Sequence, residues 1–282
     1  MNDHIIHHPA IFPVGPLPLT GFGLALLLAF VVSQIISQRE LVRRGHDASA
    51  IPDLLLASVV GTLIGGKLYY AILTHDWSSL VSRAGLVFWG GLIGGITVTL
   101  LVIVLKKIPV WRITDVAGIA IAAGYSVGRT GCWAVGDDYG RPWNSPLAVE
   151  FPEGAPPSTA ANLQQLFGLH VPPSARATDV LAVHPTQIYE TVLGFVMFMI
   201  LWRLRDHKHA EGWLFGVYCL LAGIERFIIE FFRAKDDRFF GTFTMAQLIA
   251  LGFIAAGATI MTLRSKTGAG KPGIYATAVA NA

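Results

Sequence analysis

Seven apolar runs, each long enough to cross a lipid bilayer as a helix, constrain this chain more than any other feature of its sequence. A helix needs about 20 mainly apolar residues to span roughly 30 Å of hydrocarbon. The backbone of such a segment must satisfy its own hydrogen bonds, which favours helices. We therefore expect an all-α integral membrane protein, a bundle of seven transmembrane helices at residues 17–36, 51–73, 86–105, 113–127, 188–204, 213–232 and 243–263.

The composition supports a membrane protein and excludes several other classes. Of the 282 residues, 53% are hydrophobic and 14% are charged, whereas soluble domains are about 25% charged. The net charge of +3 comes from short basic clusters between apolar runs, so it indicates membrane topology and no nucleic-acid partner. Cys132 and Cys219 fit neither a disulfide framework nor a metal-binding spacing. We expect no metal and no cofactor.

The distribution of basic residues predicts the orientation of the bundle. The loops after the first, third, fifth and seventh runs hold twelve Lys and Arg residues, and the opposite short loops hold four. Because basic residues are retained on the cytoplasmic side, the N-terminus is expected outside and the C-terminus in the cytoplasm. A polar segment at residues 129–185, after the fourth run, then lies outside. We expect one domain over residues 1–282, with a flexible Gly/Ala-rich tail at 267–282.

The N-terminal residues carry three histidines but no secretory cleavage signal. The first sixteen residues lack a basic region and a small-residue cleavage site, so the first span is expected to stay in the mature protein. His4, His7 and His8 are expected to be solvated or to lie at the membrane interface, since no second cluster of ligands supports the alternative of a metal site.

Charged residues within apolar runs are functional candidates, because they are costly in lipid and usually face a bundle interior or an aqueous cavity. Lys67 and Glu190 are two of them. Arg226, Glu230 and Arg233 recur at i, i+4 and i+7, on one face of a helix. One interpretation is a structural ion pair between Arg226 and Glu230. The other is an anion site, since two arginines flanking one glutamate leave that face positive.

The segment from Gly124 to Arg141, GYSVGRTGCWAVGDDYGR, is the densest group of polar residues and glycines. Guanidinium groups bind phosphate oxygens in pairs, so Arg129 and Arg141 near an apolar environment suit the phosphate ester of a lipid. The glycines of this segment are expected to let a loop bend around a head group. By contrast, the glycines of FWGGLIGG at residues 88–95 are typical of close helix packing.

Four fragments, in order, resemble one known family. FWGGLIGG, GRTGCWAVGDDYGR, HPTQIYE at residues 184–190 and ERFIIEFFR at residues 225–233 are similar to those of the prolipoprotein diacylglyceryl transferase family of bacterial inner membranes. The resemblance covers residues 17–263. It implies a multi-pass inner-membrane enzyme with a periplasmic N-terminus. Such an enzyme transfers the diacylglyceryl group of phosphatidylglycerol to the lipobox cysteine of a prolipoprotein and releases glycerol phosphate.

The resemblance also implies roles for individual residues. Arg129 and Arg226 match the essential arginines that bind the phospholipid head group. The catalytic candidates are completed by Asp137, Glu230 and His184. Candidates for substrate binding are Arg141, Gly128, Gly131, Gly140, Tyr125, Gln187, Tyr189, Glu190, Lys67 and Trp89. The implied partners are phosphatidylglycerol, the signal peptide and lipobox of a prolipoprotein, and membrane lipids.

Four positions depart from the family pattern. Trp89 replaces the histidine of a His-Gly-Gly run that has been proposed as the base for the thiol, and tryptophan cannot accept a proton. Cys132 replaces an asparagine, Asp137 a glutamate and Lys67 an arginine. Candidate replacement bases are Asp137, Asp138, His184 and Glu230, although the His184 imidazole also suits a structural hydrogen bond to a backbone carbonyl that anchors the HPTQIYE turn. Cys132 suits either a buried filler or a covalent nucleophile.

Two other functions remain open at the level of the sequence. One is a catalytically altered paralogue that binds anionic phospholipid or lipoprotein without transfer. The other is a small-solute transporter, which a charge-lined path through the bundle would favour. The charges gather toward the outer side, which argues against transport. The segment 143–183 does not indicate its role, and a plain surface loop is favoured there over an outer cap.

Overall fold

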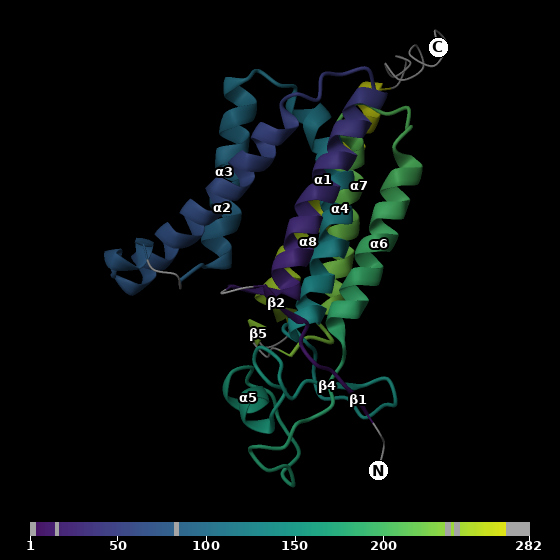
Figure 1. Cartoon of the computed structure of the whole chain (residues 1–282). Helices are drawn as coiled ribbons and strands as arrows, with labels where there is room; N and C mark the ends of the chain where they lie inside the picture. Colours follow the sequence, from purple (N-terminus) through teal and green to yellow (C-terminus); the bar gives the residue numbers. More distant parts are fainter. Residues whose placement is uncertain (1–3, 15–16, 82–84, 235–237, 240–242, 269–282) are drawn as a thin grey trace. The chain divides into compact units, whose positions relative to one another are not determined.

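The computed structural model describes residues 4–14, 17–81, 85–234, 238–239 and 243–268. The expected all-helical fold is confirmed (Figure 1). The helices are α1 (Gly21–Arg43), α2 (Ile51–Thr74), the 3-10 helix η1 (Trp77–Val81), α3 (Phe88–Leu105), α4 (Val110–Val135), α5 (Ala160–Gln165), α6 (Thr186–Leu204), α7 (Trp213–Ile229) and α8 (Met245–Gly268). The strands are β1 (Ile5–Ile6), β2 (Ile11–Val14), β3 (Leu17–Thr20), β4 (Val149–Glu150), β5 (Arg238–Phe239) and β6 (Phe243–Thr244).

The chain is a multi-pass membrane protein. Each expected span coincides with a long helix, and five of these helices, α1, α2, α3, α6 and α8, are long and apolar enough to cross a membrane. The other two expected spans are α4 and α7. α4 carries Arg112, Asp115 and Arg129, and α7 has 17 residues with Glu225 and Arg226 in its last turns.

The helix ends differ from the expected span ends, most informatively in the first, fourth and last spans. Residues 17–20 form β3, so the first helix begins at Gly21, and β6 precedes α8. The fourth helix continues past the expected end at residue 127 to Val135. It stops where Gly136 takes a φ of +69° and its N–H bonds back to the carbonyl of Cys132 at 3.0 Å. Glycine adopts this left-handed conformation without a steric penalty.

The chain divides into two compact units, and the second consists of Gln34–Val116 in the described part. Within it, α2 and α3 lie side by side (Figure 1). A methyl group on Gly65 would overlap the backbone of Gly90, and one on Gly94 would overlap that of Gly61. The close helix packing expected from the glycines of FWGGLIGG is therefore confirmed.

The first unit contains the described residues of Met1–Ser33 and Ala117–Gly273. Here α7 packs on α8 and on α6. Two of the glycines expected to bend a loop, Gly128 and Gly131, lie inside α4 instead. A Cβ on Gly131 would come within 2.9 Å of the Cβ of Ala25, so this glycine admits α1 closely against α4. That part of the loop prediction was wrong, because the helix continues through these positions.

The polar segment after α4 has a hydrophobic core of its own, so it is not a plain surface loop. Tyr139 and Phe151 stack with ring centroids 5.2 Å apart. The buried members of the core are Tyr139, Val149, Phe151, Leu163, Leu169, Val183 and Ala234. The Tyr139 hydroxyl donates to the carbonyls of Pro156 and Pro157 at 2.9 and 3.0 Å. This core could not be predicted from the sequence, because its members are far apart in the chain and are separated by polar residues.

The N-terminal strand completes this layer. β1 pairs in parallel with β4, and the next residue, His7, is buried with its ring 4.7 Å from that of Trp133 and 4.9 Å from that of Phe151. The expectation of a solvated or interfacial histidine was wrong for His7, because the parallel pairing carries it into the aromatic core. The expected flexible tail at 267–282 begins within the last residues of α8, and from residue 269 onward it lies outside the described residues.

Candidate functional site

Three arginines of the first unit converge on one buried carboxylate. Glu190 lies in the second turn of α6, and its side chain is 2% exposed. Arg129 of α4 forms an ion pair with Glu190. Arg226 of α7 and Arg233, just beyond that helix, reach the other Glu190 oxygen at 3.9 and 3.7 Å. Because all three guanidinium groups contact this one side chain, Glu190 holds the arginines together.

Asp138 bridges two of these arginines from the loop after α4. Its Oδ2 lies 2.9 Å from Arg129 Nη1, and its Oδ1 lies 3.0 Å from Arg233 Nη2. Burial raises the pKa of Asp138, but the charges and hydrogen bonds of Arg233 and Arg129 outweigh this effect and hold the pKa below its ordinary value. The side chain is nevertheless 41% exposed. Asp138 is therefore the most accessible carboxylate of the network.

Glu230 completes the network at the end of α7. Its Oε2 accepts a hydrogen bond of 2.7 Å from Arg226, one turn earlier, and lies 3.9 Å from Arg233. The ion pair between Arg226 and Glu230 expected from their spacing is therefore present. The expectation of a net positive face was wrong, because Glu190 and Asp138 from other elements balance the second and third arginines. We call these six residues the arginine cluster: Arg129, Arg226, Arg233, Asp138, Glu190 and Glu230.

Backbone contacts hold the loop after α4 against the ends of α6 and α7. Gly140 donates its N–H to the carbonyl of His184 at 2.8 Å, and Arg141 donates its N–H to that of Phe232 at 2.8 Å. A Cβ on Gly140 would lie 2.7 Å from the Cβ of His184, so this position requires glycine. The Arg141 side chain also donates from Nε to the carbonyl of Arg233 at 3.1 Å. Arg141 thus holds the backbone at Phe232 and Arg233 against the loop after α4.

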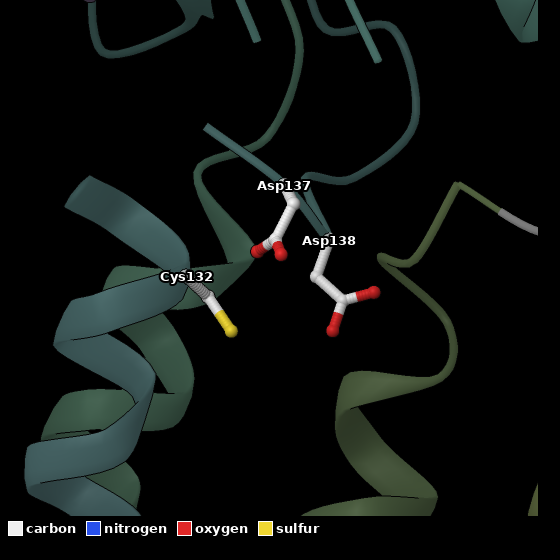
Figure 2. Close-up of side chains that lie close together, drawn as sticks. All are labelled: Cys132, Asp137 and Asp138. Atoms are coloured by element: carbon white, nitrogen blue, oxygen red, sulfur yellow. The ribbon is translucent and has the colours of Figure 1, made fainter. Parts of the chain in front are cut away.

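Asp137 lies beside the cluster (Figure 2). The backbone carbonyl of Asp137 accepts a hydrogen bond of 2.6 Å from Nε2 of Gln187. Burial raises the pKa of the Asp137 carboxyl above its ordinary value, partly offset by a hydrogen bond with the Cys132 thiol. Its Oδ1 has no hydrogen-bond partner within the described part of the chain. Asp137 is therefore a half-buried carboxyl with a free acceptor atom and an increased proton affinity.

The same corner offers three potential metal ligands, which Figure 2 shows on the last turn of α4 and the loop after it. The Cys132 sulfur and the carboxylates of Asp137 and Asp138 have ligand atoms within 4.8 Å of one another. Arg129 Nη1, however, lies 3.4 Å from the sulfur and 2.9 Å from Asp138. A cation at this corner would therefore compete with a guanidinium that is already in place.

Comparisons with known proteins agree with this geometry. A family model described as prolipoprotein diacylglyceryl transferase matches residues 9–263. The chain belongs to the prolipoprotein diacylglyceryl transferase family. A phosphatidylglycerol–prolipoprotein diacylglyceryl transferase of Mannheimia succiniciproducens is 30% identical over 272 residues, covering 90% of this chain and 92% of that protein. One from Geobacter sulfurreducens is also 30% identical, over 92% of this chain and 95% of that protein.

Other residues expected in the site of a diacylglyceryl transferase lie next to the arginine cluster. Tyr125, one turn before Arg129 on α4, donates its hydroxyl to Glu225 at 2.9 Å. His184 stacks on Trp143 with ring centroids 4.3 Å apart, and its Nδ1 lies 3.2 Å from the Tyr189 hydroxyl. Burial lowers the pKa of His184, so its imidazole is neutral at neutral pH. The partner of the imidazole is thus the Tyr189 hydroxyl, and the expectation of a backbone carbonyl was wrong.

Two expected residues belong to the second unit. Lys67 of α2 donates from Nζ to the carbonyl of Ser79 in η1 at 3.3 Å. Trp89, which stands where the diacylglyceryl transferase pattern has a histidine, lies in the first turn of α3, is 43% exposed, and contacts Phe88 edge-on. Their described contacts are with residues of the same unit.

Sequence reasoning gave too little weight to three residues. Arg233 appeared only as the third member of a helical face, and Asp138 only as one possible base, yet both are central to the arginine cluster. Glu225 appeared only as the first residue of the fragment ERFIIEFFR, and its partner is Tyr125 on another helix. The i+7 spacing of Arg233 was the available signal. Nothing in a linear sequence indicated that Asp138 meets Arg233.

Proposed function

We propose that this chain transfers the diacylglyceryl group of phosphatidylglycerol to the lipobox cysteine of a prolipoprotein and releases glycerol phosphate. Family membership supports this activity, as do the names of relatives at 30% identity over nearly the whole chain. The structural observation that carries it is the convergence of Arg129, Arg226 and Arg233 in a protein of membrane-spanning helices. A phosphate anion attached to a lipid is the chemical group that such a site suits.

The reaction requires a stabilised leaving group and a deprotonated thiol. The sulfur attacks the glyceryl carbon that bears the phosphate ester, so a C–S bond forms while the C–O bond breaks. The electron pair of the broken bond leaves on the phosphate oxygen, where negative charge develops. Guanidinium donors held in fixed positions lower the energy of that charge. We assign this role to Arg129 and Arg226, with Arg233 as a third donor.

The proton of the thiol needs an acceptor, and Trp89 cannot provide one. We assign this role to Asp137, because its Oδ1 lacks a partner in the described residues and burial raises its pKa. A carboxylate of raised pKa is a better general base at neutral pH. Cys132, which donates to Asp137, then positions the carboxylate and is not the nucleophile. Gln187 holds the backbone of Asp137 in place.

The finer features of membrane placement are part of the same proposal. We propose seven spans, with α4 and α7 crossing as well, a periplasmic N-terminus and a cytoplasmic C-terminus in the bacterial inner membrane. The excess of basic residues after alternate spans supports this orientation. The polar segment would then lie on the periplasmic side, where lipobox cysteines are presented. The family match runs across both units, which supports one functional domain.

Complementation tests the proposed activity. The chain should sustain growth and lipoprotein maturation in bacteria depleted of their own transferase, and Arg129→Ala or Arg226→Ala should abolish that support. Unprocessed prolipoprotein despite good membrane expression of the wild-type chain would refute transfer and favour a paralogue that only binds its ligands. Activity that survives both arginine substitutions would refute the site assignment.

A further inference from the structure

Asp138 occupies the position in which a phosphate would bridge two arginines. One carboxylate oxygen faces Arg129 Nη1 at 2.9 Å, and the other faces Arg233 Nη2 at 3.0 Å. Two oxygens of a phosphate group can accept from two guanidinium groups in the same way. The carboxylate of Asp138 therefore imitates half of the contacts that a bound phosphate would make.

The other two carboxylates of the arginine cluster are unsuited to leave it. Glu190 and Glu230 are 2% and 1% exposed, and each belongs to a helix or its cap. Removing either from its arginines would leave buried charges without partners, which is strongly unfavourable. Asp138 is different, because it lies in a loop and its side chain is 41% exposed. Water can solvate this carboxylate when another anion takes its place.

Two further features support an exchange of anions at Asp138. Its φ is +56°, in the left-handed region that aspartate adopts more often than most residues, and in this conformation the carboxylate contacts both arginines. The formal charges of the cluster cancel while Asp138 is in place. Withdrawal of one carboxylate leaves one positive charge, which matches the single negative charge of a phosphodiester.

We propose that Asp138 is an internal competitor for phosphate, held between Arg129 and Arg233 until the phosphate of a phospholipid or of glycerol phosphate displaces it. This inference rests on the proposed function only for the identity of the ligand. Asp138 then sets the affinity of the site and favours release of the anionic product, because it returns to the arginines when the phosphate leaves. It is a specificity-determining residue that need not touch the reacting carbon.

Binding measurements on the purified full chain test this proposal without requiring catalysis. The substitution Asp138→Asn removes the charge and preserves the backbone, since asparagine tolerates left-handed φ values. It should tighten binding of glycerol phosphate, measured by calorimetry, by roughly three- to tenfold. In vesicles it should tighten binding to phosphatidylglycerol relative to phosphatidylcholine by a similar factor. The two measurements show whether glycerol phosphate or the lipid head group is the anion that displaces Asp138. Tighter binding of either ligand supports the proposal.

Three variants make the test specific. Asp138→Gly also accepts a positive φ and serves if the asparagine variant does not fold. Arg233→Gln in the Asp138→Asn background should remove the gain. Glu153→Gln makes the same change of charge on an exposed residue paired with His8 in the same segment, and it should leave affinity unchanged.

The outcomes separate this inference from the proposed function. Unchanged or weaker binding of both ligands by folded Asp138→Asn and Asp138→Gly would overturn the inference, whether or not the chain transfers lipid. A gain equal to that of Glu153→Gln would also overturn it, because the effect would then be one of general charge. Tighter binding by the variants of a chain that fails complementation would support the inference about Asp138 and would refute the proposed transferase activity.

Discussion

Arg233 and Asp138, 95 positions apart in the chain, are joined by a hydrogen-bonded ion pair of 3.0 Å between Nη2 and Oδ1. This pair connects the end of α7 to the loop after α4. Arg233 also lies 3.7 Å from Glu190, so one side chain touches a buried and an accessible carboxylate. Arg233 therefore links the accessible carboxylate of the loop to the buried carboxylate of α6.

Loss of Arg233 should reduce transfer strongly. Arg233→Ala removes one of three guanidinium donors, and we expect at least a tenfold lower rate, since one such donor contributes on the order of 10²-fold or more in other enzymes. Arg233→Lys should restore only part of it, because an ammonium group lacks the planar fork. Transfer to a lipobox peptide in vesicles measures the effect. Arg176→Ala, on an exposed arginine of the polar segment, is the control, and equal losses in both variants would refute a special role for Arg233.

Glu190 should be essential for folding stability as well as for the geometry of the arginine cluster. Glu190→Ala leaves three arginines without their common partner, and breaking a buried ion pair in this way typically costs about 3–5 kcal/mol. Thermal unfolding in detergent micelles should show a much lower midpoint than the wild type. Glu153→Gln should leave the midpoint within error. A stable Glu190→Ala variant would show that the cluster does not depend on this carboxylate.

The contribution of Asp138 to stability should disappear in acid. Its pKa in the folded protein lies below the ordinary value, so the ionised form stabilises the fold above the unfolded-state pKa of about 3.9. That stabilisation is lost as pH falls through the lower, folded-state pKa. The groups facing Asp138 are Arg129 and Arg233, with Asp137 and Cys132 nearby. The difference between the unfolding midpoints of the wild type and Asp138→Asn should be full at neutral pH and should shrink as the pH falls below the unfolded-state pKa of about 3.9. A constant difference would contradict this assignment.

The contact between α2 and α3 should tolerate no side chain at Gly65. A Cβ there would overlap the carbonyl of Gly90, and forced separation of packed helices costs roughly 1–3 kcal/mol. Gly65→Ala should therefore lower the unfolding midpoint. Gly252→Ala is the matched control, because a Cβ at this helical position of α8 meets nothing within 4 Å. Alanine favours helix over glycine by about 1 kcal/mol, so the control should be neutral or stabilising, and equal losses would contradict the packing argument.

The sequence predicted the helices well, because a long apolar segment in lipid satisfies its backbone hydrogen bonds by forming a helix. It also predicted the pairing of Arg226 with Glu230, since both lie on one helix. It did not predict the partners of Arg233 or the position of His7, because these depend on how distant segments meet. Gly131 shows a third limit. A glycine beside an arginine resembles a loop in the sequence, whereas here it allows α1 to approach α4.

The parallel pairing of β1 with β4 has a consequence for the order of events during synthesis. Ile5 and Ile6 are made well before their partners Val149 and Glu150, and domains generally form from the N-terminus onward during synthesis. The first strand must therefore wait, unpaired, while α1 to α4 are being made. Its docking cannot precede the arrival of residue 150, so assembly of the outer aromatic layer is a late step in the biogenesis of this protein.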